Sequence, residues 1–161
     1  MLTLTLRRLP WLALVCWLGL GCDSQKQQEN FVDSANAPPA GFTRTDAGGQ
    51  ILTDDPDDWR TAPFYIGKIR VDPAYPNPST SDFVNLPVTV LEFDAIGGRL
   101  TLRSFDDQRR GILLDEILDA SSPGAYSFRF TPARLVTNGL HRVFIFDQFG
   151  EIISYGDLMV E

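Results

Sequence analysis

Residues 138–160 read NGLHRVFIFDQFGEIISYGDLMV, two apolar segments joined by a short polar turn. The segments 138–146 and 151–160 are rich in Val, Ile and aromatic residues, which favour β-strands. The intervening DQFG combines Asp with Gly, a pairing typical of tight turns between antiparallel strands. These 23 residues therefore predict a β-hairpin.

The same pattern of short apolar runs and turn signals extends upstream to residue 59. We expect five further strands at residues 64–71, 82–93, 99–106, 112–118 and 125–130. In the last of these, Tyr126, Phe128 and Phe130 alternate with smaller residues and should form an aromatic face. A single helical turn is expected at residues 130–136, and no amphipathic helix anywhere. About seven strands at this spacing predict an all-β fold, an antiparallel β-sandwich of immunoglobulin-like type in preference to a closed barrel.

Four segments of this region occur in a characteristic order: AYPNPST, LTLRSFDDQRRG, PGAYSFRF and NGLHRVFIF. Together they resemble an immunoglobulin-like module found in the flagellar hook-capping protein and at the C-termini of exported bacterial proteins. In those exported proteins the module often acts as the sorting domain for type IX secretion. The resemblance covers residues 64–160 and implies the sandwich fold. His141 stands where the family usually has Tyr, and the acidic GDLMVE replaces the usual basic last strand. The resemblance thus implies the fold without the sorting role.

The first residues point to export. Arg7 and Arg8 precede an apolar run over residues 11–21, which is too short to span a bilayer as a stable helix and is typical of a secretory signal. The run ends in LGLGC, which resembles the lipobox of bacterial lipoproteins, although Gly19 stands where that family usually has Leu. The resemblance implies a signal peptide over residues 1–21, lipidation of Cys22, and a place in the cell envelope on the extracytoplasmic side. An ordinary signal peptide and an uncleaved anchor are the alternatives, and the choice of inner or outer membrane stays open.

Residues 22–58 have the composition of a linker. They are polar, contain Pro and Gly, and show no sustained period of 2 or 3.6 residues. From residue 23 onward they carry eight acidic and two basic side chains. We expect a lipid-anchored, flexible, acidic linker whose span of roughly 30 Å holds a single domain, residues 59–161, clear of the membrane. The net charge of −7 and the lack of a basic patch argue against nucleic acid and anionic headgroups as partners.

Candidate residues for chemistry are few. His141 is the only histidine, and we interpret it as a partly packed residue on a strand face because a metal ligand or general base needs partners. The densest acidic cluster, Asp54 to Asp58, is interpreted as a solvated hinge in preference to a calcium site, since Pro56 interrupts the ligand spacing. No Gly-x-Ser-x-Gly motif occurs. We expect no enzyme activity and no cofactor.

The segment DPAYPNPST at residues 72–80 predicts a rigid corner, because each Pro fixes φ near −65°. Asn77 is expected to bond locally and close this turn. Tyr75 and Trp59 lie outside the clear strands and are the candidate contacts for a partner. The predicted function is a lipid-anchored envelope protein with a non-catalytic binding or structural module. The alternatives are an accessory component of an envelope secretion or assembly machine, which would dock an envelope protein, and a carbohydrate-binding module.

Overall fold

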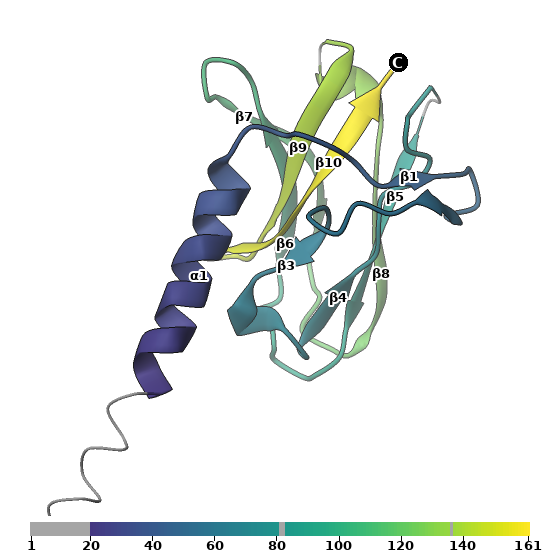
Figure 1. Ribbon diagram of the computed structural model, residues 1–161. Coiled ribbons are helices and arrows are strands. Elements are labelled where there is room, and N and C mark those ends of the chain that lie inside the picture. Colours follow the sequence, from purple (N-terminus) through teal and green to yellow (C-terminus); the bar gives the residue numbers. More distant parts are fainter. Residues whose placement is uncertain (1–19, 81–82, 136) are drawn as a thin grey trace, which may run out of the picture.

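The computed structural model describes residues 20–80, 83–135 and 137–161, excluding the side chains of residues 20–23. The described residues form ten strands in antiparallel sheets, one α-helix and two 3₁₀ helices (Figure 1). In chain order they are α1 (Leu20–Asn36), β1 (Arg44–Thr45), β2 (Ile51–Thr53), β3 (Arg60–Thr61), η1 (Pro63–Tyr65), β4 (Ile69–Val71), β5 (Val84–Val90), β6 (Leu100–Phe105), β7 (Gly111–Ile117), β8 (Gly124–Phe130), η2 (Pro132–Leu135), β9 (Gly139–Phe146) and β10 (Ile152–Val160). The prediction of a mostly β, sandwich-like fold is confirmed.

Two sheets enclose the core. One has five strands in the order β3-β10-β9-β6-β7, and the other has three in the order β4-β5-β8, while β1 and β2 form a separate pair (Figure 1). The predicted hairpin is β9 and β10, and the predicted helical turn is η2. The predicted strand over residues 64–71 is wrong in its first half, where Pro63 begins a 3₁₀ helix and leaves only Ile69–Val71 as strand.

The core is built by alternation on the strands. On β5, every second residue from Val84 to Val90 is buried, as expected for a strand with one face on the core. Leu86 pairs with Phe128 and Val84 with Phe130 on β8, so the predicted aromatic face of that strand points inward. The facing sheet contributes side chains that are equally inaccessible to solvent, among them Leu100, Leu102, Ile145 and Leu158.

Three turns share one hydrogen-bonding geometry, in which an Asp carboxylate closes a five-residue loop. Its Oδ1 accepts hydrogen bonds from the backbone N–H groups two and four residues later, at 2.8–2.9 Å. These Asp residues are Asp46, Asp106 and Asp147. The fourth residue of each loop has a positive φ: Gly49 at 84°, Arg109 at 59° and Gly150 at 87°. The carboxylate thus replaces the missing sheet partner of two N–H groups in each turn.

The flexible linker predicted over residues 22–58 is wrong for its described part. Residues 20–36 form α1, and Phe31 and Ala35 of this helix are buried in the domain core. Farther along, the Thr45 hydroxyl donates to the Ala74 carbonyl at 2.8 Å, and Thr45 and Asn77 exchange backbone hydrogen bonds. The segment before residue 59 is therefore part of the folded domain. The predicted signal peptide lies outside the described residues except for the backbone of its last two.

Asn77 bonds over long distances instead of closing its own turn as predicted. Its amide nitrogen donates to the Thr43 carbonyl at 2.9 Å and to the Asp157 carbonyl at 3.0 Å, and its side-chain oxygen accepts from the Met159 N–H at 3.0 Å. The side chain is fully buried, and its three bonds join the segment before β1 to β10, which explains why a polar side chain occupies the interior.

Within the described part of the chain, no helix is long and apolar enough to cross a membrane.

Candidate functional site at the end of the sandwich beside α1

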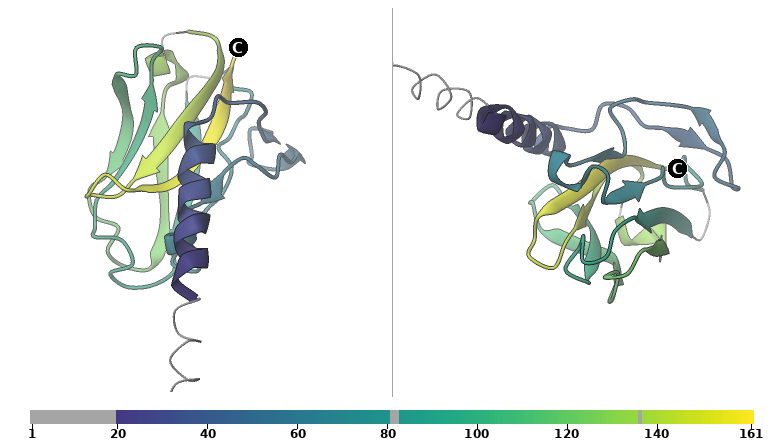
Figure 2. Two further views of the ribbon diagram at one scale, coloured as in Figure 1. Left: turned by 60° about the vertical axis from the view of Figure 1, so that its left-hand side comes forward. Right: turned by 90° about the horizontal axis from the view of Figure 1, so that it is seen from below.

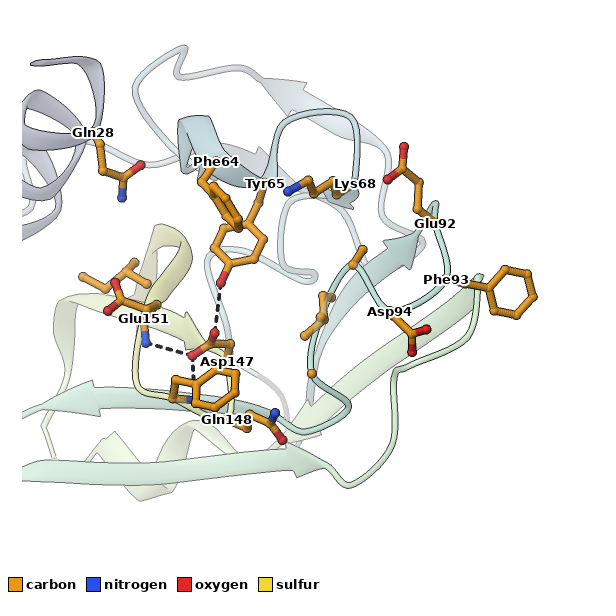
Figure 3. A pocket seen from close by; sticks show the side chains of 15 residues that line it. Gln28, Phe64, Tyr65, Lys68, Glu92, Phe93, Asp94, Asp147, Gln148 and Glu151 are labelled. Atoms are coloured by element: carbon orange, nitrogen blue, oxygen red, sulfur yellow. Dashed lines mark hydrogen bonds between the residues drawn. The ribbon is translucent and has the colours of Figure 1, made fainter. Parts of the chain in front are cut away.

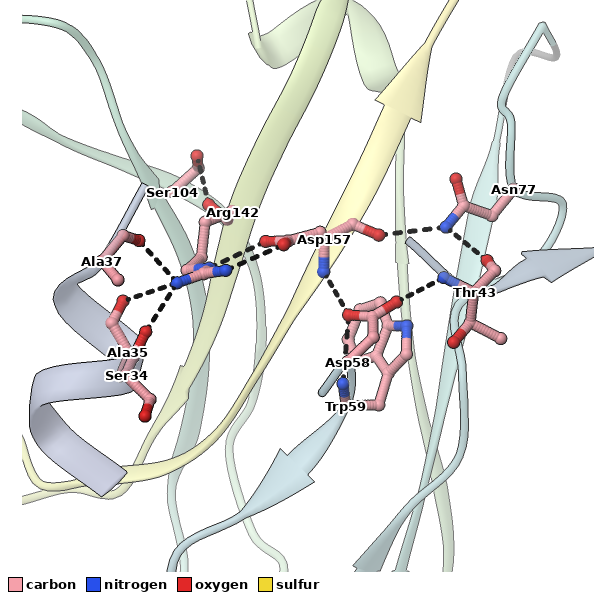
Figure 4. A network of polar contacts seen from close by, with 10 residues as sticks. All are labelled: Ser34, Ala35, Ala37, Thr43, Asp58, Trp59, Asn77, Ser104, Arg142 and Asp157. Carbon is pink, nitrogen blue, oxygen red and sulfur yellow. Dashed lines mark hydrogen bonds and ion pairs between the residues drawn. The ribbon is translucent and has the colours of Figure 1, made fainter. Parts of the chain in front are cut away.

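Helix α1 is held against the outer face of the five-stranded sheet. The Phe31 ring lies 5.3 Å from the Tyr155 ring of β10, and the Arg142 guanidinium of β9 lies 4.8 Å from the same ring. The last turn of α1 has no basic residue of its own. Arg142 supplies that charge from the sheet, because its Nη1 donates to the carbonyls of Ser34 at 2.8 Å, Ala35 at 3.3 Å and Ala37 at 2.6 Å (Figure 4). The helix terminus thereby gains partners for carbonyls that α1 cannot satisfy itself.

Arg142 belongs to a larger buried network. Its Nε and Nη2 each bond an oxygen of the Asp157 carboxylate at 2.8 Å (Figure 4). The Asp157 N–H donates to Asp58 at 2.6 Å, and the other Asp58 oxygen accepts from the Thr43 N–H at 2.7 Å. Burial raises the pKa of Asp58 from its ordinary 3.8 to about 6, although these backbone donors favour the charged form. The network fixes α1 and the segment around Thr43 to β9 and β10.

The two predicted partner contacts have different places in the fold. Trp59 is buried, with 7% of its surface exposed, and its ring packs over Gly156 of β10. The prediction of an exposed contact at Trp59 is therefore wrong. Its indole N–H has no hydrogen-bond partner among the described residues. Tyr75 is half-buried and exchanges backbone hydrogen bonds with Asn85, and its ring lies beside Gly49. Nothing brings Trp59 and Tyr75 together as one surface.

The acidic cluster from Asp54 to Asp58 is not arranged around a common point. Asp58 turns inward to the backbone groups described above, and Asp55 accepts from the Asp57 N–H at 3.1 Å. In the described ranges no group of three or more His, Cys, Asp or Glu side chains is placed to hold a metal ion.

His141 is half-buried on β9, and its Nε2 donates to the Thr137 carbonyl at 2.8 Å. Its ring thus serves a local backbone contact.

A hollow of about 830 Å³ opens at one end of the sandwich, where η1, the β5–β6 loop and the β9–β10 turn meet beside α1 (Figure 3). At its centre the Tyr65 hydroxyl donates to Asp147 at 3.0 Å, which ties η1 to the turn. Burial and this hydrogen bond raise the pKa of the Tyr65 phenol above its usual value. Gln28 of α1 lines the same hollow. The Tyr65–Asp147 bond therefore fixes η1 to the β9–β10 turn, and the β5–β6 loop and α1 complete the lining of the hollow.

Large apolar side chains at this end of the sandwich point into solvent: three of them line the hollow, and Ile66 directly follows η1. Phe64, Ile66, Phe93 and Phe149, which we call the apolar rim, are 65%, 68%, 75% and 78% exposed. Phe93 projects outward from its loop (Figure 3). Sequence reasoning missed these residues because they were assigned to strands or turns. An aromatic side chain inside a turn, as in DQFG, is the signal that could have found them, since turns are usually polar.

A second depression, the aromatic groove, lies beside the C-terminal end of α1 on the outer face of the five-stranded sheet. It has a volume of about 600 Å³ and is lined by Phe105, Phe144 and Phe146 together with the residues that follow α1. The Phe105 and Phe144 rings meet edge to face at 5.4 Å, and Phe144 stacks on Phe146 at 5.9 Å. These rings form a continuous apolar wall.

Comparisons with protein-family models, with curated proteins and with solved structures found no match to this chain.

Proposed function

We propose that this chain is a lipid-anchored protein of the cell envelope, attached at Cys22 on the extracytoplasmic side, whose folded part is a non-catalytic binding or structural module. One observation carries the proposal. The lipobox-like LGLGC ends within the first turn of α1, a helix whose later residues Phe31 and Ala35 belong to the domain core. An acyl group on Cys22 would therefore be joined to the folded domain by continuous helix.

The anchor is tested by metabolic labelling of the full chain with a fatty-acid analogue in a bacterial host. The Cys22→Ser variant should lose the label and leave the membrane fraction, because acylation requires the thiol. The Cys16→Ser variant is the matched control and should keep both, since residue 16 precedes the cleavage site. A Cys22→Ser protein that retains the label, or a wild-type chain that never acquires it, contradicts the proposal.

The sandwich is proposed to be of immunoglobulin-like type. The order of the strands supports this: β4, β5 and β8 correspond to strands A, B and E, and β10, β9, β6 and β7 to strands G, F, C and C′. The bond from His141 to the carbonyl four residues upstream resembles the contact that a tyrosine makes near the start of strand F in such domains. Backbone nuclear Overhauser contacts between β5 and β8, and between β6 and β9, would check this order, and their absence would contradict it.

The aromatic groove supports a carbohydrate-binding module as the second candidate function. Aromatic faces bind the apolar faces of sugar rings, and Asp107 and Arg109 at the same groove offer polar groups for hydroxyls. Titration of the full chain with peptidoglycan-derived oligosaccharides, followed by calorimetry, tests this function. Binding that the Phe105→Ala variant loses supports it, and absence of heat at millimolar sugar contradicts it.

A further inference from the structure

The end of the sandwich that bears the apolar rim is an unusual surface for a small domain. Beyond the rim itself, Leu91 and Leu118 at the same end are 47% and 72% exposed. The loops that carry these side chains are tied together, because the Leu91 N–H donates to the Lys68 carbonyl at 2.8 Å and the Asp94 N–H to the Ser121 carbonyl at 3.0 Å. An exposed apolar surface held this firmly is typical of a site that contacts a partner or a membrane.

Helix α1 starts at this same end. Figure 1 and the left view of Figure 2 show the start of α1 level with the β5–β6 and β7–β8 loops. The β9–β10 turn lies beside the middle of the helix, and the last turn of α1 and the C-terminus of the chain lie toward the opposite end. Cys22 lies nine positions before the buried Phe31, which corresponds to about 14 Å of helix. An anchor at Cys22 therefore brings the apolar rim toward the bilayer, where the flexible linker expected from the sequence would have held the domain away from it.

The charges around the hollow determine which lipid headgroups this surface can approach. Four carboxylates line it, from Glu92, Asp94, Asp147 and Glu151, against the single ammonium group of Lys68. Anionic headgroups would be repelled by this balance, whereas the ammonium groups of zwitterionic headgroups complement it. The Lys68 ammonium itself lies 3.7 Å from the centre of the Phe64 ring, so part of the one positive charge is already engaged.

We propose that the apolar rim inserts into the interfacial region of a zwitterionic bilayer, so that the domain lies on the membrane to which Cys22 anchors it. This inference rests on the proposed function, because the anchor sets which end faces the lipid. Aromatic and aliphatic side chains are favoured at the headgroup boundary, and the rim would enter without any change in the fold. Anchoring at Cys22 makes the contact intramolecular, which raises the effective concentration of lipid at the rim.

Depth-dependent fluorescence quenching tests the docking. The full, acylated chain is reconstituted into phosphatidylcholine vesicles whose acyl chains carry bromine, and each of the variants Phe93→Trp and Phe149→Trp is compared with Leu52→Trp. Leu52 is the matched control because it is also exposed, at 59%, but lies on β2 away from the rim. Both rim variants should lose at least half of their added fluorescence, while the control loses little. Equal quenching at the three positions would overturn the proposal.

Two further readouts separate the possible failures. Acyl labelling of the same preparations reports the anchor: a labelled chain whose rim variants are not quenched contradicts the docking and leaves the anchor intact. An unlabelled chain contradicts the proposed function, and with it the orientation that docking requires. Replacing a third of the lipid by phosphatidylglycerol should reduce the quenching at Phe93→Trp, because the carboxylates repel this headgroup. Stronger quenching in the anionic vesicles would contradict the choice of a zwitterionic surface.

Discussion

Arg142 on β9 and Asp157 on β10 form a two-pronged ion pair, with two N–O distances of 2.8 Å, on the face of the sheet that α1 covers. The pair is nearly inaccessible to solvent, since Arg142 exposes 13% of its side-chain surface and Asp157 exposes 5%. The Arg142 guanidinium therefore bonds both to the neighbouring strand β10 and to the carbonyls at the end of α1. The attachment of α1 to the sandwich should therefore depend on Arg142 more than on any exposed charge.

The Arg142→Ala variant should lose about 3–5 kcal/mol of unfolding free energy, because it leaves the Asp157 carboxylate buried without its partner and removes the donor to the α1 carbonyls. Urea denaturation at neutral pH measures this loss. The control is Arg110→Ala, whose ion pair with Asp106 is largely exposed at the arginine, so that its loss should change the free energy of unfolding much less. Equal losses in the two variants would contradict the special role of Arg142.

The docking of α1 also shows where sequence reasoning reached its limit. In the segment from residue 24 to 36 only Phe31 and Ala35 are buried, four positions apart in an otherwise polar stretch. Two buried residues are too few for a recognisable helical period. The helix is held by contacts from β9 and β10, namely with Arg142 and Tyr155, which lie more than a hundred residues away in the sequence. The strands, in contrast, could be predicted because each carries its own alternation, as on β5.

The candidate site was predictable to a smaller extent. The order of the strands could not be read from the sequence, so the meeting of η1, the β5–β6 loop and the β9–β10 turn around Tyr65 and Asp147 was not foreseeable. Trp59 was misplaced because a residue between strands can turn inward as easily as outward. The signal for its true position was Gly156, since a glycine inside a strand often marks the close approach of another group.

That close approach gives a prediction for Gly156. A Cβ at this position would overlap the fused ring atoms of Trp59, which fills the space above the strand. The Gly156→Ala variant should therefore lose about 1–3 kcal/mol of unfolding free energy, as overpacked core positions do. The control is Gly124→Ala on β8, where an added Cβ would meet the Tyr126 ring at an ordinary 3.6 Å. A Gly156→Ala protein as stable as the control would show that Trp59 does not occupy this space.

Arg109 is the exception among the three Asp-closed turns, because it has a positive φ where the other two turns have Gly. A left-handed conformation is costly for a residue with a Cβ, so Arg109→Gly should raise the free energy of unfolding by roughly 0.5–1 kcal/mol. The reverse change, Gly150→Ala in the equivalent position, should lower it by a similar amount. Thermal unfolding of both variants measures the effect, and a destabilised Arg109→Gly variant would contradict the shared geometry.

Asp58 should make stability depend on pH in an unusual direction. Its pKa in the folded protein is raised to about 6 by burial, above the ordinary 3.8, so the folded state binds a proton more readily than the unfolded chain in this interval. The stabilising contribution of Asp58 is therefore complete below about pH 4 and is lost as the pH rises through about 6.

The Asp58→Asn variant cannot titrate at this position, and comparing it with the wild type isolates the effect from other carboxylates. The difference in unfolding free energy, wild type minus variant, should grow by up to about 3 kcal/mol as the pH falls from 7 to 4. Urea denaturation at each pH measures it, and the carboxyl ¹³C shift of Asp58 should titrate with a midpoint near 6. A difference that stays constant, or shrinks on acidification, would mean that the backbone donors from Thr43 and Asp157 outweigh the cost of burying the charge.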